Sequence, residues 1–135
     1  MTITSIIAII VMAIVILAAI NLANRAKSTC VDKAYIRNEW VDILNMSKDP
    51  KTRPMSIIRA DKLLNEALKG CGYQGNSVGE RLISAKNGLK HRNEIWNAHK
   101  LRNKIVHQSL FEPTEKEVNT ALNGYHQTFK DLGVI

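Results

Sequence analysis

A short polar run, LRNKIVHQ at residues 101–108, contains side chains that can handle phosphate. Arg102 carries a guanidinium that can bind a phosphate through two N–H groups at once. His107 carries an imidazole that gains or loses a proton near pH 7, as a general acid or base must. Asn103 lies one helical turn before His107 and places an amide on the same helix face. The run therefore predicts either a phosphate-handling site or a polar face of a small helical bundle.

Positive charge is concentrated around this run. Residues 86–107 contain six Lys or Arg side chains, a single acid and three of the chain's four histidines. This stretch supplies most of the formal net charge of +7, which favours an anionic partner such as nucleic acid or a lipid surface. The alternative is a solvated basic face that binds nothing. If the face does bind nucleic acid, the candidate contacts are Arg92, His99, Lys100 and Lys104.

The sequence predicts neither a metal site nor a cofactor. On an ideal helix His99 and His107 would share one stripe with Trp96 and Asn103. The two histidines are eight residues apart, which is about 12 Å along a helix axis and too far for one ion. The two cysteines, Cys30 and Cys71, are too few and too isolated to indicate a disulfide framework or a zinc site.

The elements that must position these residues are all expected to be helices. Apolar residues recur at helical spacing in five segments, and the sequence contains no convincing strand signal. Ser77 and Thr114, each followed three residues later by a glutamate, predict capping boxes at two helix starts. We therefore expect an all-α bundle of about five helices, with the polar run on the fourth. The expected ranges are 28–47, 54–69, 78–85, 94–108 and 115–132.

The N-terminal segment is expected to be a single transmembrane helix. Residues 3–23 contain no charged side chain, and 6–20 are apolar without interruption. A helix of 21 residues is roughly 30 Å long, which matches the hydrocarbon core of a bilayer. A cleaved signal peptide is the main alternative, but such peptides begin with a basic region, and no basic side chain precedes this run.

The charges that flank the apolar run predict its orientation. Arg25, Lys27 and Lys33 follow the run closely, against the single acid Asp32. Positive flanks stay on the cytoplasmic side of a membrane. We therefore expect a single-pass protein of the cytoplasmic membrane, with an anchor and basic flank at 1–27 and a cytoplasmic domain at 28–135.

The polar run also resembles the signature of a known family. RNKIVH, with Arg102, the polar Asn103, three further residues and His107, is similar to the motif of HEPN domains. The expected all-α context, with the motif on a late helix of a five-helix domain, looks like that family as well. The resemblance extends over roughly residues 28–132, although only the six-residue motif is diagnostic.

The resemblance implies a metal-independent endoribonuclease that acts as a homodimer, with two motifs in one composite cleft. Arg102 would contact the scissile phosphate, His107 would serve as general acid or base, and Asn103 would orient the histidine or bind phosphate. A candidate partner is an antitoxin or a nucleotidyltransferase-like protein. Because the family also contains members that do not cleave, the competing hypothesis is a non-catalytic interaction or scaffold module at the cytoplasmic membrane face.

Overall fold

The computed structural model describes residues 2–27 and 31–135, and the chain divides into two compact units. The first unit contains one long helix, α1 (Ile3–Lys27). The second, Val31–Ile135, contains five helices, in agreement with the expected bundle. Its helices are α2 (Lys33–Lys48), α3 (Arg53–Gly70), α4 (Val78–Ser84), α5 (Arg92–His107) and α6 (Glu115–Asp131). Within the described residues we find no strand.

Between Ile3 and Leu22, helix α1 is apolar on all sides and its side chains are exposed. The stretch Ile3–Leu22 has a mean hydropathy of 3.1, and none of it is buried. By length and composition it is the one described helix that could cross a membrane. The expected first domain helix begins at Lys33 rather than at residue 28, and residues 28–30 lie outside the described residues. Asp32 causes this start, because its carboxylate accepts the N–H of Tyr35 at 3.1 Å.

Local signals fix the other helix ends close to their expected positions. Helix α2 ends at Lys48, and the next residue, Asp49, is extended because Pro50 follows it. Thr114 forms the expected capping box with Glu117. At Ser77 the box is only half formed: the serine hydroxyl accepts the N–H of Glu80, but the Glu80 carboxylate reaches back to the N–H of Asn76.

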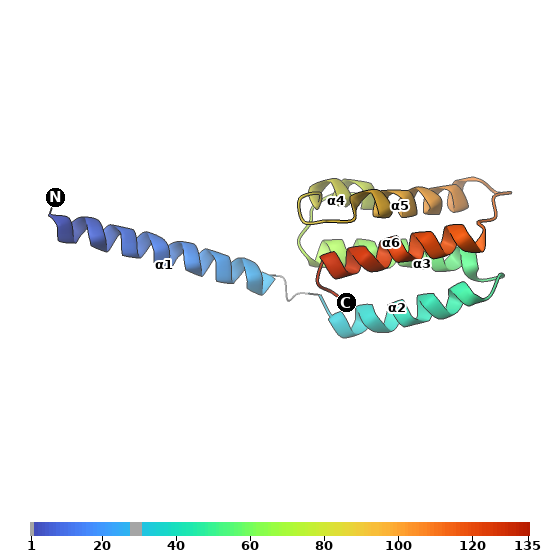
Figure 1. The fold of residues 1–135 in the computed structure, drawn as a ribbon, viewed down its shortest axis with the longest axis horizontal. Helices are drawn as coiled ribbons and strands as arrows, with labels where there is room; N and C mark the ends of the chain where they lie inside the picture. Colours follow the sequence, from blue (N-terminus) through green and yellow to red (C-terminus); the bar gives the residue numbers. More distant parts are fainter. Residues whose placement is uncertain (1, 28–30) are drawn as a thin grey trace. The chain divides into compact units, whose positions relative to one another are not determined.

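The bundle packs four long helices around one core, with the short α4 beside α3 (Figure 1). Helix α3 lies against α2, α5 and α6, and α6 also lies against α5. Full burial of one such aliphatic side chain stabilises the fold by roughly 1.5–3 kcal/mol. The fully buried large side chains come from every helix of the bundle and include Ile36, Ile43, Ile57, Leu64, Leu68, Leu82, Ile95, Val118, Tyr125 and Phe129.

Helices α5 and α6 approach each other closely at Gly124. A Cβ atom at this position would lie 2.9 Å from the carbonyl oxygen of Glu94. Glycine in a helix interior costs about 1 kcal/mol relative to alanine. Its presence here lets the two helix backbones come into contact.

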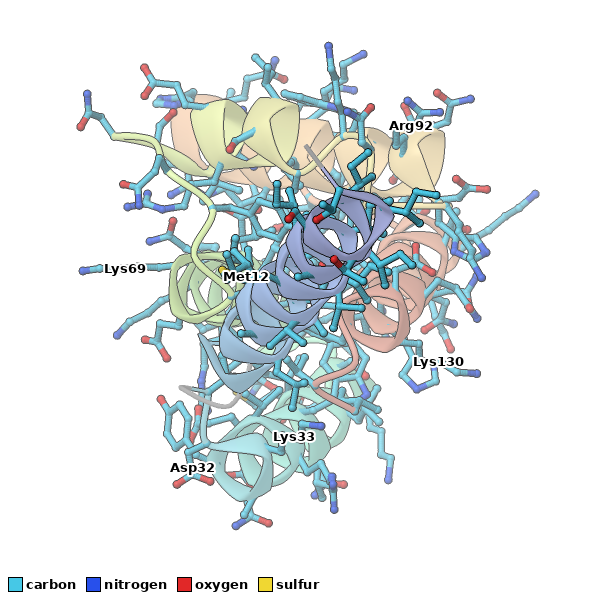
Figure 2. All side chains as sticks on the ribbon, turned by 90° about the vertical axis from the view of Figure 1, so that its left-hand side faces the viewer. Met12, Asp32, Lys33, Lys69, Arg92 and Lys130 are labelled. Atoms are coloured by element: carbon cyan, nitrogen blue, oxygen red, sulfur yellow. The ribbon has the colours of Figure 1, made fainter. Side chains whose placement is uncertain are left out.

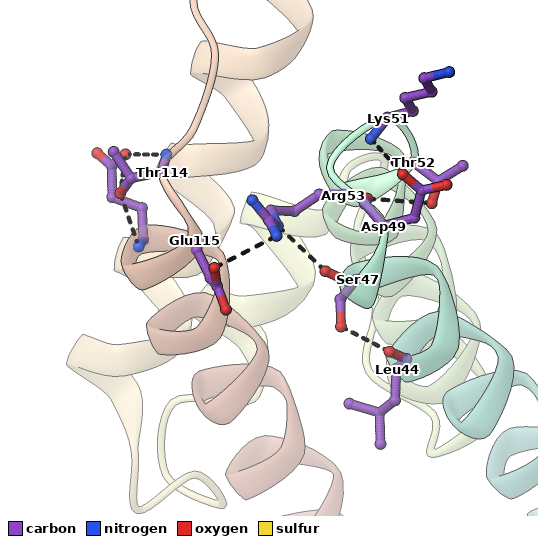
Figure 3. A network of polar contacts seen from close by, with 9 residues as sticks. Leu44, Ser47, Asp49, Lys51, Thr52, Arg53, Thr114 and Glu115 are labelled. Atoms are coloured by element: carbon purple, nitrogen blue, oxygen red, sulfur yellow. Dashed lines mark hydrogen bonds and ion pairs between the residues drawn. The ribbon is translucent and has the colours of Figure 1, made fainter.

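Arg53 ties together three helices at the end of the bundle that carries the α5–α6 connection (Figure 3). Its Nε donates to the carbonyl oxygen of Ser47 at 3.2 Å, near the end of α2. Its Nη2 lies 3.6 Å from a carboxylate oxygen of Glu115, at the start of α6. The segment that follows His107 is thereby attached to the rest of the bundle.

Candidate functional site

Helix α5 carries the polar run and turns its apolar stripe into the core. Ile95, Ala98 and Leu101 are buried, and Ile105 packs against the same cluster, as the sequence spacing predicts. This packing fixes the rotation of α5 about its axis. The remaining side chains of the run therefore point to two flanks of the helix, one toward α3 and one toward α6.

A buried carboxylate lies on the flank toward α3. Asp61 is 2% exposed, and its Oδ1 accepts two hydrogen bonds from other helices. The Nδ1 of His99, from α5, lies 2.8 Å away, and the hydroxyl of Tyr125, from α6, donates at 2.9 Å. A buried carboxylate requires such partners, because an unpaired charge in the interior is strongly unfavourable.

Arg102 supplies the positive charge for this carboxylate. Its Nε lies 3.6 Å from Oδ2 of Asp61, which is an ion pair but too long for a hydrogen bond. Its Nη1 donates to Oδ1 of Asn103 at 3.0 Å. The side chain is still 32% exposed, and Nη2 has no hydrogen-bond partner among the described residues. The guanidinium is thus held on one side and open to a ligand on the other.

The same carboxylate keeps Tyr125 protonated. Burial, together with the charge of Asp61 and the hydrogen bond to it, raises the pKa of the Tyr125 hydroxyl well above its ordinary value. The tyrosine is therefore a permanent hydrogen-bond donor at physiological pH. Its role is to hold Asp61 in place rather than to exchange protons.

His107 is the last residue of α5 and is exposed. It makes no hydrogen bond or ion pair with any residue that the structure describes. Positions five apart on a helix differ by about 7.5 Å in height and about 140° in angle. The structure therefore brings Arg102 and Asn103 together. His107 lies one turn after Asn103 but is turned away from Arg102 in a single copy of the chain.

The predicted nucleic-acid contacts are divided over different surfaces. Lys100 and Lys104 border a groove of about 540 Å³ between α5 and α6, with Lys116 on its other side. The Nζ of Lys104 also lies 4.9 Å from the ring centre of Phe111. Arg92 is exposed at the first turn of α5, about 22 Å along the axis from His107. His99 turns inward to Asp61 and is only 13% exposed.

Two residues of this arrangement, Asp61 and Tyr125, were missed by the sequence reasoning. A signal for Asp61 was present: it occupies an apolar-face position of α3, spaced by four and three residues from Ile57 and Leu64. A charged residue at such a position indicates a buried partner. For Tyr125 no signal existed, because an aromatic residue on an apolar face is ordinary core packing.

Comparison of the chain with protein-family models, with curated proteins and with solved structures finds no match. The resemblance to HEPN domains is therefore one of motif and helical context alone.

Proposed function

We propose that the chain is a membrane-anchored, metal-independent ribonuclease of HEPN type, with its helical domain in the cytoplasm. One observation carries the chemical part of this proposal. Asp61 and Asn103 contact the guanidinium of Arg102, while the Arg102 side chain as a whole stays 32% exposed. An arginine that is pre-positioned and partly open binds a phosphate at little entropic cost.

The proposed reaction is attack of a ribose 2′-hydroxyl on the adjacent phosphorus. His107 removes the proton from the 2′-oxygen, which bonds to phosphorus as the bond to the 5′-oxygen breaks. A second, protonated histidine gives its proton to that leaving oxygen, and a 2′,3′-cyclic phosphate remains. Arg102 stabilises the negative charge that develops on the non-bridging oxygens.

This reaction requires two copies of the chain. Each motif supplies one exposed histidine, whereas the reaction uses a base and an acid at the same time. A homodimer that joins two α5 helices would place one His107 near the Arg102 of its partner. The separation of these residues within one copy supports an arrangement of this kind.

The chemical test is cleavage of RNA by the purified chain in the presence of EDTA. We expect 2′,3′-cyclic phosphate ends, and a rate about 100- to 10,000-fold lower for His107→Ala. The matched control is Gln108→Ala, which removes an exposed neighbour at the same end of α5 and should leave the rate unchanged. A wild-type chain that leaves RNA intact, or His107→Ala cleaving at the wild-type rate, would show that the nuclease proposal is wrong.

The membrane part of the proposal rests on α1 and on the basic residues Arg25, Lys27 and Lys33 that end or follow it. A reporter that is active only in the cytoplasm, fused after Ile135, should give its signal in the membrane fraction. The protein should resist extraction by alkaline carbonate. Release into the soluble fraction, or a new N-terminus after cleavage of α1, would contradict the anchor.

A second candidate, a non-catalytic interaction module, is favoured by the groove between α5 and α6. Its lining includes the apolar side chains Ala98, Leu101 and Ala121, with both lysines and glutamates at its border. Such a groove suits an amphipathic segment of a partner. One assay separates the two candidates: a dimeric wild-type chain that cleaves no RNA favours the interaction module.

A further inference from the structure

The two ends of the bundle differ in charge. The first contains Val31, where the chain enters the bundle, together with the end of α3, the start of α5 and the end of α6 (Figure 1). A Cβ at Gly70 would touch the Val31 side chain, so the end of α3 lies beside the point where the chain enters the bundle. Asp131 accepts hydrogen bonds from the N–H groups of Lys90 and His91, so the end of α6 lies beside the start of α5. We call this the entry end. The opposite end contains the α2–α3 and α5–α6 connections.

Exposed positive charge dominates the entry end. Figure 2 views the bundle from this side, with Lys33, Lys69, Arg92 and Lys130 labelled. The acids here are few: Asp32 and Glu94 are exposed, and Asp131 is already bound by His91. The exposed basic residues are Lys33, Lys69, Lys90, Arg92 and Lys130.

The opposite end carries less surplus positive charge. Its exposed lysines are equal in number to its exposed acids. Arg53, which also lies there, is paired with one of those acids, Glu115. The lysines are Lys48, Lys51, Lys104 and Lys116, and the acids are Asp49, Glu112, Glu115 and Glu117. Exposed basic residues therefore outnumber exposed acids at the entry end, whereas exposed lysines and exposed acids are equal in number at the opposite end.

The length of the connection limits where the entry end can be. Helix α1 ends at Lys27 and α2 begins at Lys33. Six steps of extended chain reach roughly 20 Å. If α1 spans a bilayer, Val31 and the residues around it must therefore stay within about two Debye lengths of the lipid headgroups at physiological salt.

We propose that the entry end of the bundle is a docking surface for anionic lipid headgroups, so that the domain rests on the cytoplasmic face of the membrane through this end. This inference rests on the proposed anchor but not on the proposed nuclease. Lysines near an anionic membrane surface each strengthen binding by about fivefold. The end with His107, which is the opposite one, then faces away from the membrane.

The test is lysine acylation of the full chain in lipid nanodiscs, read by mass spectrometry. Discs of neutral phosphatidylcholine are compared with discs that also contain phosphatidylserine. Lysines of the entry end should react at least threefold more slowly in the anionic discs, and high salt should abolish the difference. Lys48, Lys51, Lys104 and Lys116, at the opposite end, are internal controls and should react equally in both.

A pair of charge-reversal variants sharpens the test. Lys69→Glu with Lys130→Glu should remove the protection of Lys33 and Lys90. The matched control, Lys48→Glu with Lys51→Glu, makes the same charge change at the opposite end and should keep that protection. All four positions are exposed, so the core is left intact.

Three results would overturn the inference. Equal acylation rates in neutral and anionic discs would show that the entry end does not meet the lipid, while the anchor stands. Protection of the entry-end lysines by a non-cleavable RNA on neutral discs would assign this surface to RNA instead. Loss of the chain from neutral discs in high salt would remove the anchor on which the inference rests.

Discussion

The bundle contains two aspartate–histidine pairs that are similar in geometry but differ in their structural roles. In both, a histidine Nδ1 of α5 or its N-terminal flank contacts a nearly buried carboxylate, at 2.8 Å for His99–Asp61 and 3.1 Å for His91–Asp131. Asp131 receives its other hydrogen bonds from the backbone N–H groups of Lys90 and His91, so it holds the backbone that leads into α5. Asp61 accepts its hydrogen bonds from side chains only, those of His99 and Tyr125.

The difference shows how a structural pair can be told from a pair that supports a site. The Asp131 pair holds the backbone before α5, and its histidine is 37% exposed. The Asp61 pair lies among three helices and also holds Arg102, whose guanidinium reaches the surface. The buried carboxylate of Asp61 fixes the orientation of a side chain that reaches the surface, that of Arg102. Asp131 instead stabilises the backbone before α5.

The largest expected effect is that of Asp61→Ala. It leaves the Arg102 Nε and the Tyr125 hydroxyl without their buried partner, which should lower the free energy of unfolding by about 3–5 kcal/mol. Urea unfolding of the detergent-solubilised chain, followed by tryptophan fluorescence, measures this because both tryptophans lie in the bundle. The control is Asp42→Ala, an exposed position of α2. A loss below 1 kcal/mol would remove the distinction between the two pairs.

A smaller effect is expected for Asp131→Ala, about 1–2 kcal/mol, because it removes the acceptor of two backbone N–H groups and of His91. Burial by itself would raise the pKa of Asp131, but the hydrogen bonds from His91 and Lys90 outweigh it and lower the pKa below the ordinary value. The stabilisation by Asp131 is therefore present above about pH 4 and is lost as the pH falls below that. Urea midpoints between pH 2.5 and 6 should converge for wild type and variant at the acid end; parallel curves would argue against this role of Asp131.

Tyr125→Phe should cost about 1 kcal/mol, the net value of one hydrogen bond. The ring keeps its packing, and Asp61 keeps His99 and Arg102 as partners. The same fluorescence titration measures the change. A cost as large as that of Asp61→Ala would mean that Tyr125, rather than Arg102, is the main partner of the carboxylate.

The smallest effect is expected for Lys100→Ala, within about 0.5 kcal/mol of wild type. This residue of α5 lines the groove between α5 and α6, and it belongs to neither aspartate–histidine pair. If Lys100→Ala destabilised the bundle by more than 1 kcal/mol, the charges of the groove would stabilise the fold in addition to the two aspartate–histidine pairs.

Sequence spacing predicted the number and order of the bundle helices, because several of their ends have a local cause. Asp32, Pro50 and Thr114 act on their own neighbours in the chain, and apolar residues recur at helical spacing between them. The site was predicted less completely. The run 101–108 was found, but the partner of Arg102 comes from α3, 41 residues earlier, and only packing of α3 on α5 brings the two together.

The charge cluster of residues 86–107 shows the same limit. In the sequence its six basic residues form one run, whereas in the fold they separate between the entry end, the groove and the Asp61 network. Helix rotation and length decide this division. Neither can be read from residue types alone, because the rotation of α5 depends on which helices cover it.

The contact between Gly124 and the backbone of Glu94 has a consequence for motion. With no side chain between them, the two helices cannot slide or rotate past each other without bringing a larger residue against the opposing backbone. Helices α5 and α6 should therefore move as one rigid body, and a change in the shape of the bundle is expected at its other helix contacts.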